Sequence, residues 1–223
     1  MPLEQQSTQV QSYLEGLVPQ RPAEMMAMEA HAGAINFPII GPTAGYLCYQ
    51  LARMIGARRV FELGSGFGYS TAWFARAVQE NLAGTQDEGV VHHVVWDEAL
   101  SRQARGHLAA LGYSDIVRYH VGEAVAALSH TPGPFDLIFN DIDKQAYPAS
   151  LPVIAAKLRP GGLLIVDNML WSGRIFDAGD HSPATAGVRE LTRLLTEDGG
   201  WISTLLPIRD GLLVAIRVGA SGG

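Results

Sequence analysis

Short apolar runs and amphipathic segments alternate along most of the chain. Five runs rich in β-branched and aromatic residues predict strands, at 60–63, 90–96, 116–121, 135–140 and 163–166. Segments with helical spacing lie between them, an order that is typical of a parallel sheet with helices on its faces. The pattern therefore predicts one α/β domain over the whole chain, residues 1–223.

Two of the predicted helices have a clear apolar face. The members of these faces are Leu100, Ala104, Leu108 and Leu111 in one helix and Leu47, Leu51, Met54 and Ile55 in the other. Gly112 and Gly56 follow the last apolar residues, and glycine commonly ends a helix because it adopts the left-handed conformation. We expect both apolar faces to pack in the core.

The N-terminal region is expected to form a helical lid over about 1–45. Its segment 12–34 has helical character, and Pro19 and Pro22 are expected to divide that segment into two helices. At the other end of the chain, the glycine-rich segment at about 219–223 is expected to be disordered.

The last apolar runs predict an antiparallel hairpin. The run 201–208 is joined to the run 212–218 by Arg209, Asp210 and Gly211, a typical turn sequence. An antiparallel pair at this position would close one edge of the sheet.

Composition narrows the class of protein. The chain has 223 residues, of which 48% are hydrophobic, and a net charge of −6. A negative net charge argues against binding along a nucleic-acid backbone and favours a small-molecule substrate. We find no apolar run of membrane-spanning length and no signal-peptide pattern, and we expect a cytoplasmic protein that does not bind membranes. The single Cys48 lies in an apolar stretch and is expected to be a buried structural thiol.

A glycine-rich turn follows the first predicted strand. Gly64, Gly66 and Gly68 stand between this strand and a helix, where the backbone can approach a ligand and the helix N-terminus can bind an anionic group. The spacing differs from the G-x-G-x-x-G of dinucleotide-binding enzymes, which argues against a dehydrogenase. A tight turn without a ligand is the alternative. Glu62 favours a ligand, because a carboxylate in a buried strand needs a cation or hydrogen-bond donors.

Polar residues also follow two neighbouring predicted strands. Asp141 follows the strand 135–140, and Asp167 and Asn168 follow the strand 163–166. If the strands are adjacent, their carboxyl ends lie about 5 Å apart, so the three side chains can converge on one ion. Carboxylate and amide oxygens suit Mg²⁺, Mn²⁺ or Ca²⁺. An ordinary turn or helix cap is the alternative for Asp167 and Asn168 alone.

Lys144 stands three residues after Asp141. A single lysine is usually a solvated surface charge. Beside a substrate oxygen held at a metal, it becomes a candidate general base.

These residues resemble those of the cation-dependent O-methyltransferases, which include catechol and caffeoyl-CoA O-methyltransferases and many bacterial relatives. The similarity covers about 23–218 and depends on E-L-G-x-x-x-G-Y-S at 62–70, D-x-D-K with a tyrosine at 141–147 and D-N-x-L-W-x-G at 167–173. The resemblance implies a Rossmann-like class I fold, with a mostly parallel seven-stranded sheet, a C-terminal antiparallel hairpin and helices on both faces. It also implies a homodimer.

The resemblance further implies roles for individual residues. S-adenosylmethionine would be bound by Glu62, Gly64, Ser65, Gly66, Ser70, Asp97, Glu123, Ala124, Asp141 and Asp143. A divalent metal, Mg²⁺ or else Mn²⁺ or Ca²⁺, would be held by Asp141, Asp167 and Asn168. Lys144 and Asp141 would be catalytic, with Lys144 as the base, and the acceptor would contact Lys144, Asn168 and Trp171. For Trp171, packing is the alternative interpretation.

The implied reaction is methyl transfer to a hydroxylated aromatic small molecule. The metal would bind two vicinal hydroxyls of a catechol-like acceptor, Lys144 would take a proton from one, and the resulting oxyanion would attack the sulfonium methyl in line.

Two segments depart from the pattern of this family. The acidic residue that usually holds the cofactor ribose corresponds to Val95, and Asp97 either reaches the ribose from two residues later or caps the following helix. We favour the cap. The segment 38–45 replaces an S-P-E-Q-G-like stretch, so the lid and the acceptor are expected to differ.

Two other functions are compatible with the same residues. The missing ribose acid would fit a cofactor-binding protein without methyl transfer. The same site could also methylate a hydroxylated tRNA base, which would need a basic approach surface.

Overall fold

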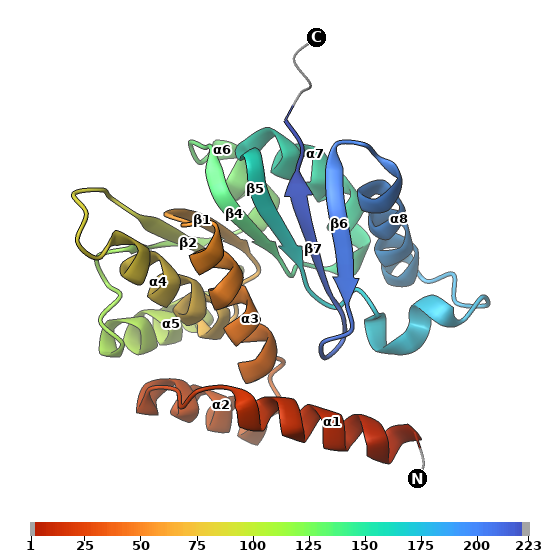
Figure 1. Cartoon of the computed structure of the whole chain (residues 1–223), viewed down its shortest axis with the longest axis horizontal. Coiled ribbons are helices and arrows are strands. Elements are labelled where there is room, and N and C mark those ends of the chain that lie inside the picture. The colour runs from red at the N-terminus through yellow and green to blue at the C-terminus, as the bar shows by residue number, and fades with distance from the viewer. Residues whose placement is uncertain (1–2, 220–223) are drawn as a thin grey trace.

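The computed structural model describes residues 3–219 and has a seven-stranded sheet at its centre (Figure 1). The strands are β1 (Arg59–Leu63), β2 (Val90–Val95), β3 (Val117–Val121), β4 (Phe135–Asn140), β5 (Leu158–Val166), β6 (Trp201–Leu206) and β7 (Leu212–Arg217). Their order is β3-β2-β1-β4-β5-β7-β6.

The last strand alone reverses the direction of the sheet. The pairs from β3 to β5 are parallel, whereas β7 is antiparallel to both β5 and β6. This confirms the predicted class I fold with its C-terminal hairpin. Because β7 starts where β5 ends, the β6–β7 turn lies at the edge formed by the carboxyl ends of the parallel strands.

Helices cover both faces of the sheet. The α-helices are α1 (Leu3–Leu17), α2 (Ala23–Ile35), α3 (Gly41–Met54), α4 (Tyr69–Leu82), α5 (Glu98–Ala110), α6 (Ala124–His130), α7 (Tyr147–Lys157) and α8 (Pro183–Glu197). Two 3₁₀ segments, η1 (Lys144–Ala146) and η2 (Trp171–Phe176), follow β4 and β5. The helices α3, α4 and α5 lie on one face, and α6, α7 and α8 lie on the other (Figure 1).

The buried strands contribute to both cores by alternation. Val60 belongs to the core that contains Trp73 of α4, whereas Phe61 belongs to the core that contains Tyr147 of α7. Successive side chains of a strand point to opposite faces, so a strand covered on both sides is apolar throughout. This explains why β4 and β5 contain consecutive apolar residues, at 137–139 and 163–166.

The N-terminal helices lie across the carboxyl edge of the sheet. In Figure 1, β6 points toward α1 and α2, which run beneath the rest of the domain. The predicted division holds, since α1 ends at Leu17 and α2 begins at Ala23, directly after Pro22. Glu29 of α2 accepts hydrogen bonds from Arg21, at 2.7 and 2.8 Å, and from the Tyr69 hydroxyl, at 2.7 Å. This network attaches α2 to the start of α4.

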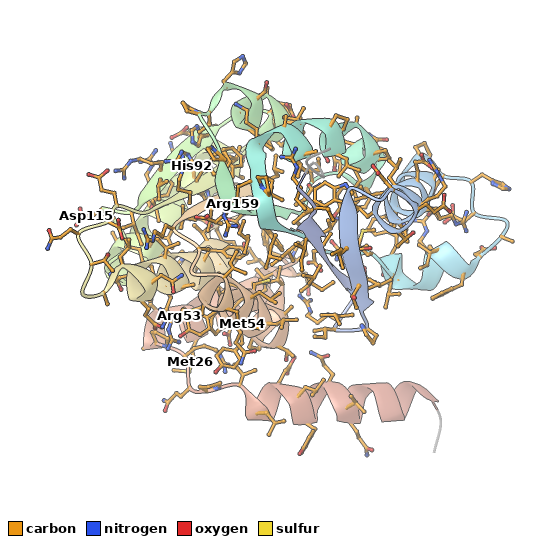
Figure 2. All side chains as sticks on the ribbon, turned by 45° about the horizontal axis from the view of Figure 1, so that its top comes forward. Met26, Arg53, Met54, His92, Asp115 and Arg159 are labelled. Atoms are coloured by element: carbon orange, nitrogen blue, oxygen red, sulfur yellow. The ribbon has the colours of Figure 1, made fainter. Side chains whose placement is uncertain are left out.

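Several predicted boundaries are wrong by a few residues. Trp96 does not belong to β2 and is 68% exposed, because the chain turns there toward α5. Met54, predicted as a core residue, is 80% exposed on the last turn of α3 (Figure 2). The strand β5 begins five residues early, at Leu158, and its register shifts opposite β4.

Two other expectations can be compared with the structure. Cys48 is fully buried, as predicted. The predicted disordered tail lies, apart from Gly219, outside the described residues. Among the described helices, none is both long and apolar enough to cross a membrane.

Candidate active site

The glycine turn after β1 brings two strand ends into contact. Gly64 has φ 84°, which favours glycine, and a Cβ atom at this position would lie 2.4 Å from the carbonyl oxygen of Asp141. The backbone N–H of Asp141 donates to the Leu63 carbonyl at 2.9 Å. Because no side chain separates them, the glycine loop and Asp141 form one continuous site.

Glu62 is a buried carboxylate at the end of β1. One of its oxygens accepts a 2.5 Å hydrogen bond from Thr71, and the other is buried without a partner. Burial raises the pKa of Glu62 to about 7, even though nearby hydroxyl groups lower it. An oxygen buried without a donor fits a cationic ligand such as an ammonium group.

A small pocket of about 30 Å³ lies between this loop and the segment that precedes α3. Its walls include Gly64, Ser65, Gly66 and Ser70 from the glycine loop and α4, and Asp141. The other wall is formed by 37–40, whose Phe37 ring lies 3.0 Å from the position of a Cβ on Gly66. Five of the predicted cofactor-binding residues, Asp141 among them, therefore line one pocket.

Asp141 and Asp167 stand at the carboxyl ends of adjacent strands. Their preceding residues pair in the sheet, and the N–H of Asp167 donates to the Asn140 carbonyl at 3.2 Å. Burial and the negative charge of Asp141 raise the pKa of Asp167 to about 6. Burial also raises the pKa of Asp141, against the charge of Lys144. Two carboxylates at close range favour a cation between them.

Asn168 adopts a left-handed conformation directly after β5. Its φ is 57°, and its N–H donates to the side chain of Asp167 at 2.8 Å. This conformation breaks the strand pleat, which two consecutive ligands on one ion require. The hydroxyl of Tyr147 donates to the Asp167 carbonyl at 2.8 Å, and this hydrogen bond helps to hold the backbone between Asp167 and Asn168.

The donor set is suited to a hard cation. Among the side chains that the structure describes, 9–219, no three of His, Cys, Asp or Glu gather as a metal-binding cluster, so a metal here needs the amide of Asn168 beside Asp141 and Asp167. Carboxylate and amide oxygens are ligands for Mg²⁺, Mn²⁺ or Ca²⁺ rather than for a thiophilic ion. The residues present therefore fit the predicted kind of metal.

Lys144 points into the same site from η1. Its Nζ lies 2.7 Å from Asp141 Oδ1 and donates to the Ile142 carbonyl at 3.2 Å. The side chain is only 9% exposed and its Nζ lies 5.1 Å from the centre of the Tyr147 ring. The Lys144 side chain is thus largely buried and ion-paired, and it is not a solvated surface charge.

Sequence reasoning missed two glycines that position this site. A Cβ at Gly187 of α8 would lie 2.2 Å from the Lys144 carbonyl, and a Cβ at Gly211 would lie 2.7 Å from the backbone nitrogen of Leu170. The first lets α8 pack on η1, and the second lets the β6–β7 turn pack on the segment after Asn168. Nothing in the sequence near these glycines signals such distant contacts.

Trp171 has an unusual backbone conformation. Its φ is 48° and that of Ser172 is 51°, in a region that bulky residues rarely adopt. Its indole Nε1 is buried without a partner, and Lys144 Nζ lies 5.8 Å from the ring centre. Strained residues persist where the surrounding structure holds them, which commonly occurs at functional sites.

Four predicted cofactor-binding residues lie elsewhere along the same edge. Asp97 is exposed and its side chain accepts from the Leu100 N–H at 2.9 Å, so it caps α5, as we favoured. Glu123 caps α6, accepting from the Val125 N–H at 2.9 Å, and the neighbouring Ala124 is buried. Asp143 is exposed and its side chain makes no cap at the start of η1.

The ribose position lacks a carboxylate in the structure as in the sequence. Val95 ends β2 with 8% exposure, and its carbonyl accepts from the Gly122 N–H at 3.0 Å. Trp96, which was predicted to belong to the strand, lies exposed beside Val95 at the same edge.

Arg209, in the β6–β7 turn, is another residue near the site, and the sequence pattern indicates only its place in the turn. Its φ is 52°, and its guanidinium donates to the Ile39 carbonyl and lies against Gly41. Its charge lowers the pKa of Asp141 and of Asp167. The turn therefore brings a cation close to the paired carboxylates.

Comparison with known proteins gives a consistent family. The sequence matches the O-methyltransferase family over residues 22–218. It is 28% identical over 218 residues to a catechol O-methyltransferase of Niastella koreensis, covering 93% of this chain and 96% of that one.

Solved structures agree in fold. The O-methyltransferase TomG of Streptomyces achromogenes, in complex with SAM, superposes with a TM-score of 0.85 at 26% identity, covering 98% of this chain and all of that one. An O-methyltransferase of Bacillus cereus, in complex with SAH, gives 0.81 at 27% identity, covering 93% and 96%. The chain belongs to the O-methyltransferase family.

Proposed function

We propose that the chain transfers a methyl group from S-adenosylmethionine to a hydroxyl of a vicinal dihydroxy aromatic, with a divalent metal in the site. The observation that carries the proposal is the meeting of Asp141, Asp167, Asn168 and Lys144 beside the glycine loop. Each of these residues comes from a strand end or from the segment after it.

The cofactor would lie along the carboxyl edge. The unpartnered oxygen of Glu62 suits the ammonium of its methionine part, and the loop with Gly64 allows its close approach. The pocket of about 30 Å³ can hold only part of the molecule, so the rest would extend along this edge. The complexes of the two solved relatives with SAM and SAH support this assignment.

The metal would be held by Asp141, Asp167 and Asn168. A bound divalent cation would supply positive charge that lowers the pKa of an acceptor hydroxyl. Lys144, now paired with Asp141, would act as the base once its ammonium has given a proton to solvent, and the neutral Nζ would then accept the proton of the acceptor hydroxyl. Trp171 would flank the acceptor ring with its partly buried indole.

The test is a methyl-transfer assay on catechols, hydroxycinnamoyl thioesters, flavonoids and tRNA, with Mg²⁺ and with excess chelator. We expect turnover of a catechol that chelator abolishes. Asp141→Ala should remove this turnover and should also weaken Mg²⁺ or Mn²⁺ binding by calorimetry. Asp115→Asn, an exposed acid far from the site (Figure 2), is the matched control.

Each failure has a distinct meaning. Full activity in chelator overturns the metal's role. Binding of S-adenosylmethionine without turnover of any acceptor favours the cofactor-binding alternative, which the apolar Val95 at the ribose position would fit. Turnover of tRNA alone would replace the small-molecule acceptor.

A further inference from the structure

A second cavity, of about 440 Å³, adjoins the cofactor pocket. The two share Phe37, Pro38 and Ile39, which form the wall between them. Its size lies within the range of about 300 to 1,000 Å³ that is usual for small-molecule sites. The cavity is thus large enough for the part of an acceptor that would extend beyond the site of Lys144, Asn168 and Trp171.

The lining of this cavity combines apolar and charged residues. Phe37, Pro38, Ile39 and Pro42 provide the apolar wall. The charged residues are Glu15, Arg21, Glu29 and Arg209. A wall of this kind suits a flat ring that carries a polar substituent.

Three of the four charged side chains already have side-chain partners. Arg21 and Glu29 form a bidentate pair at 2.7 and 2.8 Å. Glu15 is exposed and accepts a hydrogen bond from Gln11 at 2.8 Å. These groups therefore do not require a charged ligand.

Arg209 differs from them. Its Nη1 donates to the Ile39 carbonyl, and among the side chains described, those of 9–219, no carboxylate lies within ion-pair distance of its guanidinium. A guanidinium has five N–H donors in a planar fork, which matches the geometry of a carboxylate. The neighbouring Asp210 is engaged elsewhere, because its side chain accepts from the Ser172 N–H at 2.5 Å.

The position of Arg209 also costs conformational energy. A non-glycine residue with φ 52° is uncommon, and glycine would adopt this turn without strain. The strain places the side chain over Gly41, and the same turn packs on the segment after Asn168, where the Leu170 N–H donates to the Asp210 carbonyl at 2.7 Å.

We infer that Arg209 recognises a carboxylate on the acceptor, so that the preferred substrate is a vicinal dihydroxy aromatic acid and not a neutral catechol. This inference rests on the proposed function and narrows its substrate class. Arg209 acts here as a specificity residue and takes no part in the transfer.

The test compares 3,4-dihydroxybenzoate with catechol for the wild type, Arg209→Gly and Arg209→Lys. Glycine at position 209 removes the cation and adopts the positive φ of this turn without strain. Lysine keeps the positive charge but lacks the planar guanidinium that can bind both oxygens of a carboxylate. We expect the wild type to prefer the acid in kcat/KM, and Arg209→Gly to lower that preference by about 10- to 100-fold. Arg209→Lys should retain part of it, and Arg193→Gln, at an exposed surface pair, should retain all of it.

Calorimetry with SAH present gives a readout that needs no turnover. The wild type should bind 3,4-dihydroxybenzoate more tightly than catechol, and Arg209→Gly should lose this difference. Equal preference in the wild type and Arg209→Gly, in assay and calorimetry, overturns the inference while leaving methyl transfer to catechols intact. Absence of turnover on both acceptors contradicts the proposed function instead, and the calorimetric comparison still decides the role of Arg209.

Discussion

The α-carbon of Gly187 lies so close to the carbonyl oxygen of Lys144 that a Cβ at position 187 would be 2.2 Å from it. This contact lets α8 press directly on the segment that carries the candidate base. A residue more than 40 positions away thus sets the backbone position of Lys144.

We expect Gly187→Ala to displace Lys144 and lower kcat more than it affects cofactor binding. Overpacking of this kind costs about 1 to 3 kcal/mol, so the melting temperature should also fall. The measurements are kcat, SAH affinity and thermal unfolding. Gly199→Ala, where a Cβ would meet nothing within 4 Å, is the control. An unchanged kcat would show that the contact has only a packing role.

Lys144→Ala should lower kcat strongly while leaving SAH affinity within about threefold, because Lys144 contacts Asp141 and not the glycine loop. The comparison is made by single-turnover kinetics and calorimetry. Lys157→Ala, whose ammonium donates to the distant Thr131 carbonyl, is a matched lysine control. If the chemical step kept its rate, Lys144 could not be the base.

Glu62→Gln should stabilise the free protein and weaken cofactor binding. A carboxyl whose pKa rises from 4.5 to about 7 on folding loses about 3 kcal/mol of stability as pH rises through this interval. At pH 8 the amide avoids this cost, so the melting temperature should increase by several degrees. SAH binding should weaken about tenfold or more, since the ammonium loses its counter-charge.

Glu88→Gln, in an exposed loop, is the control for that experiment and should change neither quantity. Unaltered SAH affinity in Glu62→Gln would remove Glu62 from the cofactor site.

Two buried histidines of β2 should make folding sensitive to acid. Burial lowers the pKa of His92 to about 4 and that of His93 to about 3. The unfolded chain takes up these protons near pH 6.5 and the folded protein does not, so stability falls as pH drops below about 6.5. The loss is on the order of 3 kcal/mol per group and ends near the folded pKa values.

Denaturant titrations between pH 7.5 and 4 measure this dependence. His93→Gln should reduce the slope, whereas His130→Gln, on the exposed end of α6, should leave it unchanged. A slope unaffected by His93→Gln would contradict the assignment.

Asp97→Ala should cost about 1 kcal/mol of stability, because it removes the cap of α5. SAH affinity should change by less than about threefold. Asp97→Asn, which can still cap the helix, should restore stability. A tenfold loss of affinity in both variants would instead place Asp97 on the ribose.

The sequence predicts those parts of the site in which a functional residue directly follows a strand. Gly64, Asp141 and Asp167 each follow an apolar run, and parallel strands place their carboxyl ends at one edge. The alternation of elements likewise predicts the sheet and its final hairpin.

What the sequence does not predict depends on tertiary contacts. The roles of Gly187 and Arg209 arise only when α8 and the β6–β7 turn reach the site. Met54 is exposed because the last turn of α3 extends beyond the core, which helical spacing alone does not register. Trp96 follows an apolar strand directly, and its apolar side chain gives no sign in the sequence that the strand has already ended.

The reversal of β7 has an evolutionary consequence. It delivers a short surface turn, 207–211, to the edge where all the reacting groups lie, although none of the proposed metal ligands belongs to this turn. Substitutions in such a turn can change which substrates bind, while the residues proposed to carry out methyl transfer stay the same. An enzyme of this architecture can therefore diversify in substrate by exchanging a handful of residues far along its chain.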